Sequence, residues 1–116
     1  MVIFTDGIIT DLELTIQKIV EASYFAISII IVGIGNDSFS TMNRLDSDDK
    51  LLQDSRGKKA MRDIVQFVPF KKFNFNPEML ARETLAEIPN QVEQFYTKMK
   101  FIPRKKSFSK WIWNVN

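Results

Sequence analysis

One carboxylate near the start of the chain stands where α/β proteins place metal ligands. Asp6 follows the apolar run Val2-Ile3-Phe4 and precedes Gly7. A short apolar run closed by turn residues predicts a strand buried on both faces, and open α/β sheets bind ligands at the carboxyl ends of such strands. A carboxylate there can serve as an oxygen ligand for Mg²⁺ or Mn²⁺. Asp6 can also simply cap the turn, and the residues alone favour this second interpretation.

Two further motifs suggest ion or phosphate binding, but each lacks part of its pattern. Asp46-Ser47-Asp48-Asp49 offers three carboxylates for Ca²⁺, without the glycine and the distal Glu of an EF-hand loop. Gly33-Ile34-Gly35 lacks the third glycine of a dinucleotide fingerprint and the Gly-Lys-Ser/Thr ending of a P-loop. The residues favour a solvated acidic loop for the first motif and a tight turn for the second.

The composition argues against catalysis. The 116 residues contain no Cys and no His, which excludes thiolate chemistry, Ser-His-Asp triads and most transition-metal sites. No nucleophile–base pair is visible, so we expect no enzymatic activity. A net charge of +2 does not by itself indicate a nucleic-acid partner, and we expect none. The sequence shows neither a signal peptide nor an apolar stretch long enough for a bilayer, so the cytoplasm is the expected compartment.

The elements that must position Asp6 follow an α/β pattern within one domain. Strands are predicted over Val2–Thr5, Ile27–Val32 and Ile64–Val68, and the second is almost wholly β-branched. A helix between the first two strands makes a strand-helix-strand unit, which is parallel and right-handed in nearly all proteins. We therefore predict a mainly parallel sheet flanked by helices. Pro69 ends the third strand, as expected near a sheet edge.

Two helices are predicted before the third strand. The first runs from Thr10 to about Tyr24 and begins with the Thr10-x-x-Glu13 spacing of a capping box. The second is short, over Ser38–Leu45, with Asp37 or Ser38 as its cap. Residues 46–62 are polar and charged, and predict a long surface loop.

Two helical segments and a tail are predicted after the third strand. Asn76 is the expected cap of a helix with Pro77 at its first position, and Pro89 should break or kink it. A further helical piece is predicted from Gln91 to about Lys98. Residues 104–116 form a basic aromatic tail, for which a mobile, disordered segment is the favoured interpretation.

Four stretches of the chain carry a family resemblance. They are Thr5-Asp6-Gly7-Ile8-Ile9-Thr10-Asp11, Ser28-Ile29-Ile30-Ile31-Val32-Gly33-Ile34-Gly35, Arg62-Asp63-Ile64-Val65-Gln66-Phe67-Val68-Pro69-Phe70 and Leu85-Ala86-Glu87-Ile88-Pro89. Together these stretches resemble the carboxyl-terminal part of copines, which are cytosolic proteins with two C2 domains and a von Willebrand factor A-like domain. The last two resemble copines in particular among A domains. Residues 1–103 are thus identified as the carboxyl-terminal part of a copine A-like domain, which implies a partial Rossmann-like fold.

The resemblance also implies a metal site that this chain does not complete. An A domain holds Mg²⁺ or Mn²⁺ with an Asp-x-Ser-x-Ser loop, a Thr from a second loop and an Asp from a third. Asp6 matches the third position, and the other two have no counterpart in this sequence. We therefore expect no cofactor for this chain. The C2 domains, which bind Ca²⁺ and phospholipid in the family, also have no counterpart, which implies a truncated copine, a fragment or an alternative product.

A binding role is the function that the resemblance implies. We expect a non-catalytic module that recruits protein partners, which the sequence does not identify. The alternative is a peripheral membrane-binding peptide, whose basic aromatic tail contacts anionic lipid at the plasma membrane. Because Ile27–Val32 requires cover on both faces, we also expect the isolated chain to be poorly stable or to self-associate.

Overall fold

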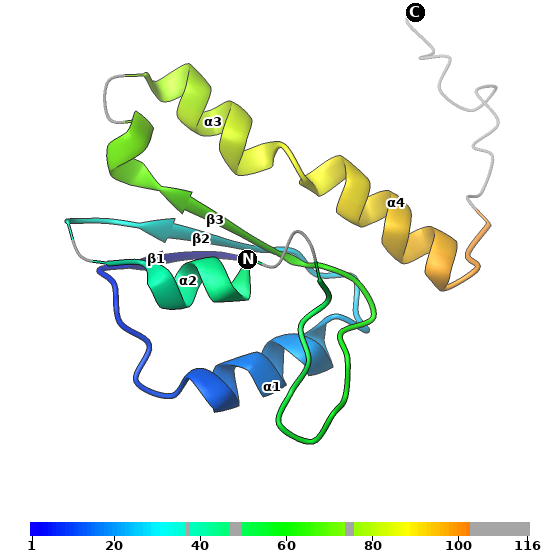
Figure 1. Cartoon of the computed structure of the whole chain (residues 1–116). Coiled ribbons are helices and arrows are strands. Elements are labelled where there is room, and N and C mark those ends of the chain that lie inside the picture. Colours follow the sequence, from blue (N-terminus) through cyan, green and yellow to red (C-terminus); the bar gives the residue numbers. More distant parts are fainter. Residues whose placement is uncertain (37, 47–49, 74–75, 103–116) are drawn as a thin grey trace, which may run out of the picture.

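The computed structural model shows a parallel sheet with helices on both faces (Figure 1). The structure describes residues 1–36, 38–46, 50–73 and 76–102. The sheet consists of β1 (Val2–Thr5), β2 (Ile29–Gly33) and β3 (Val65–Pro69), in that spatial order, and both strand pairs are parallel. The predicted α/β class and parallel sheet are confirmed. β2 begins later than predicted because the Ile27 carbonyl accepts a hydrogen bond from the Arg62 side chain and not from a neighbouring strand.

Burial differs sharply between the strands. Every residue of β2 is buried, and β3 is buried as far as Val68. The β-branched run that predicted β2 thus fills the middle of the sheet. β1 is largely exposed, and 66% of the Phe4 surface is accessible. The prediction that the first strand is buried on both faces is therefore wrong for this chain, because β1 is an edge strand.

Helix α1 (Leu12–Ala22) packs on one face of the sheet. Asp11 is its cap, and the Asp11 Oδ1 atom accepts a hydrogen bond from the Leu14 N–H at 3.2 Å. The predicted capping box of Thr10 and Glu13 is wrong, because Asp11 occupies the cap position one residue later. The buried side of α1 carries Ile16, Ile19 and Val20.

Helix α2 (Ser40–Leu45) lies on the same face as α1 (Figure 1). Its cap position is Phe39, which makes no side-chain capping bond. The predicted cap by Ser38 is therefore wrong, and Asp37 lies outside the described residues. Met42 and Leu45 of α2 join α1 and the inner face of β2 and β3 in one apolar core.

Helix α3 (Pro77–Leu85) covers the opposite face of the sheet, after a short 3₁₀ turn, η1 (Phe70–Phe73). The predicted Asn76 cap is confirmed, since the Asn76 Oδ1 atom accepts from the Met79 N–H at 3.0 Å. The side-chain amide of Gln66 in β3 donates to the carbonyl of Glu83. This hydrogen bond anchors α3, which has no buried residue of its own.

Helix α4 (Ile88–Lys98) continues past the end of the sheet (Figure 1). The predicted break between α3 and α4 is confirmed, but the predicted start at Gln91 is wrong. Pro89 lies inside the first turn of α4. A proline is accommodated there because the first helical N–H groups have no acceptor within the helix. α4 buries Gln91 and Phe95.

The segment before β3 is more deeply buried than its composition predicts. Asp54, Ala60 and Arg62 are all buried, and Gln53 forms an isolated antiparallel bridge with Lys59. The prediction of a surface loop over 46–62 is therefore wrong at these positions. The predicted tail over 104–116 lies outside the described residues.

Candidate functional site

Asp6 lies at the carboxyl edge of the sheet, one residue beyond the end of β1. Because the strands are parallel, their last residues, Thr5, Gly33 and Pro69, share this edge (Figure 1). Asp6 is exposed, whereas Gly7 is buried and has a φ of 144°. The Gly7 N–H donates to the Thr5 hydroxyl oxygen at 3.4 Å. A residue with a side chain would be strained at this φ, so the sequence specifies the turn that follows Asp6.

The residues around Asp6 do not fit the metal ion that complete A domains hold. Within the described part of the chain, Asp6 belongs to no group of three His, Cys, Asp or Glu ligands close enough to share an ion. The loop after Asp6 lines a hollow of about 340 Å³ with Ser38, Ser40 and Thr41, whose hydroxyls are neutral. Hydroxyl oxygens serve as ligands in complete A domains, but the carboxylate of the Asp-x-Ser-x-Ser loop has no counterpart in this sequence, so Asp6 would supply the only ligand charge of that site. The metal role of Asp6 stays a prediction.

A group of three carboxylates lies at the outer edge of β3. The ligand atoms of Asp46, Asp63 and Glu87 are within 4.8 Å of one another. Asp46 accepts a hydrogen bond from the Phe67 N–H at 2.9 Å, and Asp63 accepts one from the Val65 N–H at 3.1 Å. Both donors belong to the strand edge that no described strand pairs with. We interpret the group as a cap on the backbone of β3.

Sequence reasoning missed this acidic group because its members come from different elements. Asp46 was predicted to lie in a solvated loop, Asp63 at the start of a strand and Glu87 on a helix. Each prediction concerns a local segment, whereas the group exists only because α2, β3 and α4 meet. One local feature could have indicated part of the group: Asp63 directly precedes the apolar run of β3, so its carboxylate was expected near the start of that strand.

Arg62 is a second feature that the sequence did not indicate. Only 2% of its surface is exposed. Its guanidinium donates to the carbonyls of Phe25 and Ile27 at 2.7 Å each and to the carbonyl of Gln91 at 3.3 Å. It also stacks over the Phe95 ring, 5.3 Å from the ring centroid. Arg62 thereby joins the segment between α1 and β2 to α4, and its role is structural.

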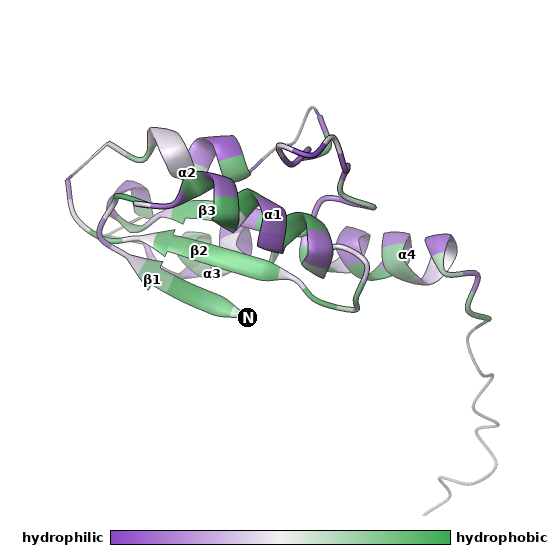
Figure 2. Cartoon of the chain, turned by 90° about the horizontal axis from the view of Figure 1, so that it is seen from below, coloured by the Kyte–Doolittle hydropathy of each residue, from purple (hydrophilic) through white to green (hydrophobic). Residues whose placement is uncertain are grey.

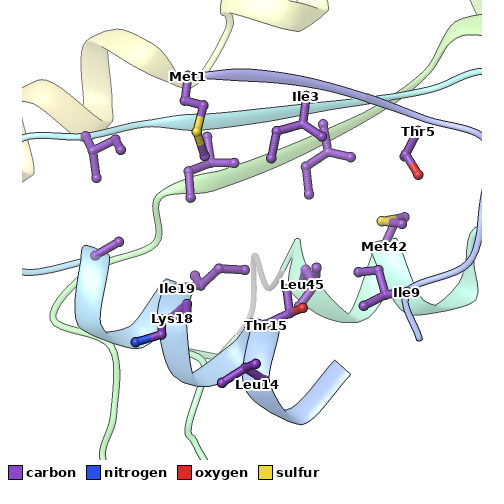
Figure 3. A pocket seen from close by; sticks show the side chains of 14 residues that line it. Met1, Ile3, Thr5, Ile9, Leu14, Thr15, Lys18, Ile19, Met42 and Leu45 are labelled. Atoms are coloured by element: carbon purple, nitrogen blue, oxygen red, sulfur yellow. The ribbon is translucent and has the colours of Figure 1, made fainter. Parts of the chain in front are cut away.

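An apolar cleft of about 510 Å³ separates α1 from the β1 side of the sheet. We call it the α1 cleft. Figure 3 shows side chains from β1, α1 and α2 around a common space. They include Ile3, Leu14, Ile19, Met42 and Leu45. The cleft gives β1 an apolar hollow on one face.

A second hollow, of about 330 Å³, lies on the opposite face of the sheet. We call it the α3 trough. It is lined by Val2 and Phe4 of β1, by Val32 of β2, and by α3 residues such as Leu80 and Leu85. Figure 2 shows β1 as a hydrophobic strand at the margin of the sheet. The α1 cleft and the α3 trough thus flank the same strand edge.

The fold agrees with the partial von Willebrand factor A-like domain that the sequence predicts. Helices lie on both faces of an open parallel sheet, in the strand-helix-strand order of that class. The sequence profile of the copine family matches residues 1–104. The chain therefore belongs to the copine family.

Three copines of Dictyostelium discoideum illustrate the match. Copine-E is 51% identical over 108 residues, which cover 92% of this chain and 19% of that protein. Copine-B is 51% identical over 105 residues, with 89% and 20% covered, and Copine-D is 49% identical over 105 residues, with 90% and 20% covered. The chain spans about a fifth of the length of these relatives. Among the residues that the structure describes, no helix is long and apolar enough to cross a membrane.

Proposed function

We propose that this chain is a non-catalytic protein-interaction module in which the β1 edge receives a polypeptide. One observation carries the proposal: β1 is exposed, apolar on both faces, and flanked by the α1 cleft and the α3 trough. Strand edges bind other chains through backbone hydrogen bonds, and adjacent hollows accept the alternating side chains. The lack of Cys and His in the sequence supports a role without catalysis.

Membership in the copine family supports a role in membrane-linked signalling. Full-length copines are calcium-dependent phospholipid-binding proteins, and this chain spans about a fifth of the length of the relatives that it matches. We propose that the chain supplies protein contacts in the cytoplasm or at the plasma membrane. The calcium-dependent step belongs to the C2 domains, whose motifs this sequence does not carry.

Affinity capture with quantitative mass spectrometry tests the interaction role. The bait is the full chain, compared with Phe4→Lys in β1 and with Phe25→Lys as a matched control. Phe4 and Phe25 are 66% and 69% exposed, and Phe25 lines neither hollow. We expect proteins that the wild type and Phe25→Lys retain equally and that Phe4→Lys loses. If every captured protein is retained equally by all three baits, the proposed role of β1 is wrong.

A second candidate function rests on the sequence of the tail. Between residues 98 and 116 the chain carries cations interleaved with aromatic residues and no Asp or Glu. They are Lys98, Lys100, Arg104, Lys105, Lys106, Lys110, Phe101, Phe108, Trp111 and Trp113. Such a pattern favours binding to an anionic membrane surface.

Liposome pelleting separates the two candidates. The probes are vesicles of phosphatidylcholine alone and vesicles that also contain phosphatidylserine. If the tail binds membranes, the full chain pellets only with the anionic vesicles, and salt releases it because the attraction is electrostatic. Removal of residues 104–116 should abolish pelleting while Phe4→Lys leaves it unchanged. Equal pelleting with both vesicles would contradict the tail hypothesis.

A further inference from the structure

Three elements each deliver one carboxylate to a common place beside β3. Asp46 follows α2, Asp63 precedes β3 and Glu87 precedes α4, and their ligand atoms lie within 4.8 Å of one another. β2 lies between this place and β1, so the group belongs to the β3 side of the sheet. All three residues are half-buried. An ion can therefore reach the carboxylates from solvent and keep part of its water shell.

Backbone hydrogen bonds hold two of these carboxylates in place. Asp63 Oδ1 accepts from the Val65 N–H at 3.1 Å, and Asp46 Oδ2 accepts from the Phe67 N–H at 2.9 Å. Val65 and Phe67 are two residues apart on one strand, so their N–H groups point to the same side. An ionised carboxylate has about four acceptor positions, and one hydrogen bond leaves room for a cation. The sheet thus positions both carboxylates before any ion arrives.

A buried amide is directed at the same group. Gln91 lies one helical turn after Glu87, and its Nε2 atom donates to Glu87 Oε2 at 3.3 Å. The Gln91 backbone is also fixed, since its N–H donates to the Glu87 carbonyl at 2.9 Å and its carbonyl accepts from Arg62 at 3.3 Å. The amide therefore has a set position beside the Glu87 carboxylate.

The oxygen of this amide needs a partner. Only 4% of Gln91 is exposed, and its Oε1 atom has no hydrogen-bond donor among the described residues. Burying such an oxygen without a partner costs free energy. A half-turn of the amide exchanges its nitrogen and its oxygen, so the oxygen can face an ion held by Glu87. Amide oxygens are ordinary ligands of Ca²⁺.

We propose that Asp46, Asp63, Glu87 and the amide oxygen of Gln91 bind a calcium ion. Charged carboxylates this close repel one another, and a divalent cation between them turns the repulsion into attraction. Two ligand oxygens on opposite sides of Ca²⁺ lie about 4.6–5.2 Å apart, which is twice the usual Ca²⁺–oxygen distance. Carboxylates within 4.8 Å of one another therefore suit this ion without a rearrangement of the fold.

The same geometry disfavours Mg²⁺. Mg²⁺ demands a near-ideal octahedron with ligands at about 2.0–2.1 Å and gives up its water reluctantly. The carboxylates of Asp46 and Asp63 are tied to the backbone of β3 and cannot contract freely around a smaller ion. Ca²⁺ tolerates irregular shells of six to eight oxygens, and water completes what the protein does not supply. The proposed site is also separate from Asp6, which lies at the carboxyl edge of the sheet, whereas Asp63 precedes β3.

The ion would join elements that are distant in the sequence. It contacts the end of α2, the start of β3 and the first turn of α4 at once. The unfolded chain does not bring these residues together, so Ca²⁺ binds the folded state preferentially and stabilises it by mass action.

Calorimetric titration of the full chain with Ca²⁺ tests the site. We expect one ion per chain with a dissociation constant on the order of 10⁻⁴–10⁻³ M, at the weak end of protein calcium sites, and binding of Mg²⁺ at least about tenfold weaker. Glu87→Gln removes a ligand charge without touching the cap on β3, and should weaken Ca²⁺ binding by about tenfold or more. Glu93→Gln on the exposed side of α4 makes the same charge change and should bind like the wild type.

A second variant and a structural measurement make the test independent of any folding defect in Glu87→Gln. Asp63→Asn keeps an oxygen that can accept from the Val65 N–H, so the backbone cap remains while the charge is lost. In the wild type and in Glu93→Gln, Ca²⁺ should shift the amide NMR signals of Val65 and Phe67 and raise the unfolding temperature. Both effects should be lost in Glu87→Gln and Asp63→Asn.

Three results would each overturn the calcium site. The first is a wild type whose Val65 and Phe67 signals do not respond to Ca²⁺, which requires no variant to fold. The second is Ca²⁺ binding that Glu87→Gln and Asp63→Asn retain in full, because the ion would then lie elsewhere on the chain. The third is equal affinity for Mg²⁺ and Ca²⁺, which would show that the carboxylates are not held at the spacing that calcium requires.

Discussion

At the scale of single residues, Arg62 is a buried cation that joins two separate segments of the chain. It is the bulkiest fully buried side chain among the described residues, and its guanidinium serves carbonyls from two separate segments. Burial lowers the pKa of Arg62, and the charge of Asp63 partly offsets this effect. Arginine stays protonated at any ordinary pH, so the site holds a permanent cation.

Replacing Arg62 should therefore destabilise the chain strongly. Arg62→Ala leaves the carbonyls of Phe25, Ile27 and Gln91 without their donor and removes packing against Phe95. We expect a loss of about 3 kcal/mol in the free energy of unfolding, measured by urea denaturation. Arg82→Ala on the exposed surface of α3 is the control and should change stability by less than about 0.5 kcal/mol. Similar effects of both variants would contradict the structural role.

Asp6 allows a second prediction at this scale. It is an exposed carboxylate that belongs to no group of three acidic ligands among the described residues. Mg²⁺ gives up its hydration water reluctantly, so one monodentate ligand adds little affinity. Calorimetric titration with Mg²⁺ and Mn²⁺ should show very weak or no binding, and Asp6→Ala should behave like the wild type. Tight binding that disappears in Asp6→Ala would show that the chain recruits further ligands.

These two residues show what sequence reasoning can and cannot reach. The place of Asp6 at the carboxyl edge follows from a local rule, since strand ends in parallel sheets share one edge. The burial of Arg62 follows from no local rule. A cation in a polar stretch of sequence predicts an exposed side chain. The Arg62 guanidinium is buried only because carbonyls from distant segments accept its hydrogen bonds.

At the scale of elements, the turn around Asp54 is held by one carboxylate. Asp54 accepts hydrogen bonds from the backbone N–H groups of Arg56 and Lys58, at 3.0 and 2.9 Å. The Arg56 side chain adds a two-pronged contact, with the Nη2 atom 2.8 Å from Asp54 Oδ2. The hydrogen bond from Arg56 lowers the pKa of Asp54 against the opposing effect of burial.

This lowered pKa predicts a loss of stability in acid. Because the pKa of Asp54 is lower in the folded chain, the stabilisation is present above the ordinary carboxyl range and is lost as the pH falls through the folded-state pKa. Asp54→Asn should lower the unfolding temperature at neutral pH. The difference in unfolding temperature between Asp54→Asn and wild type should become smaller below about pH 4. Thermal unfolding between neutral and acidic pH measures this. Glu93→Gln on α4 is the exposed control, and a constant Asp54→Asn difference would contradict the linkage.

Elements were predictable where their signals are local. The β-branched run predicted β2, and the Asn76-Pro77 pair predicted the start of α3. The cap of α1 moved to Asp11 because Asp and Thr both suit that position, and the backbone geometry selects between them. The burial of β1 was mispredicted for a different reason. Apolar residues show that a strand can be covered, but not that a neighbour is present to cover it.

At the scale of the whole molecule, the cover of the sheet is uneven. The main core lies on the face that carries α1 and α2, whereas α3 on the other face has no buried residue. On both faces the cover of the sheet is incomplete near β1, where the α1 cleft and the α3 trough lie. Few apolar contacts hold this margin, so the isolated monomer is expected to be only marginally stable.

Stability should therefore depend on protein concentration. The expected self-association covers apolar surface at this margin only in the associated state, and mass action then couples folding to association. A tenfold rise in concentration should raise the midpoint of thermal unfolding by a few degrees for the wild type and for Phe25→Lys. Phe4→Lys should unfold at a lower temperature that does not change with concentration, because its margin stays uncovered at any concentration. Differential scanning calorimetry at two concentrations measures this. A sharp, reversible transition of wild-type monomer, with the same midpoint at both concentrations, would contradict both expectations. The exposed apolar margin at β1 would then lower the free energy of unfolding little, and the chain would not self-associate.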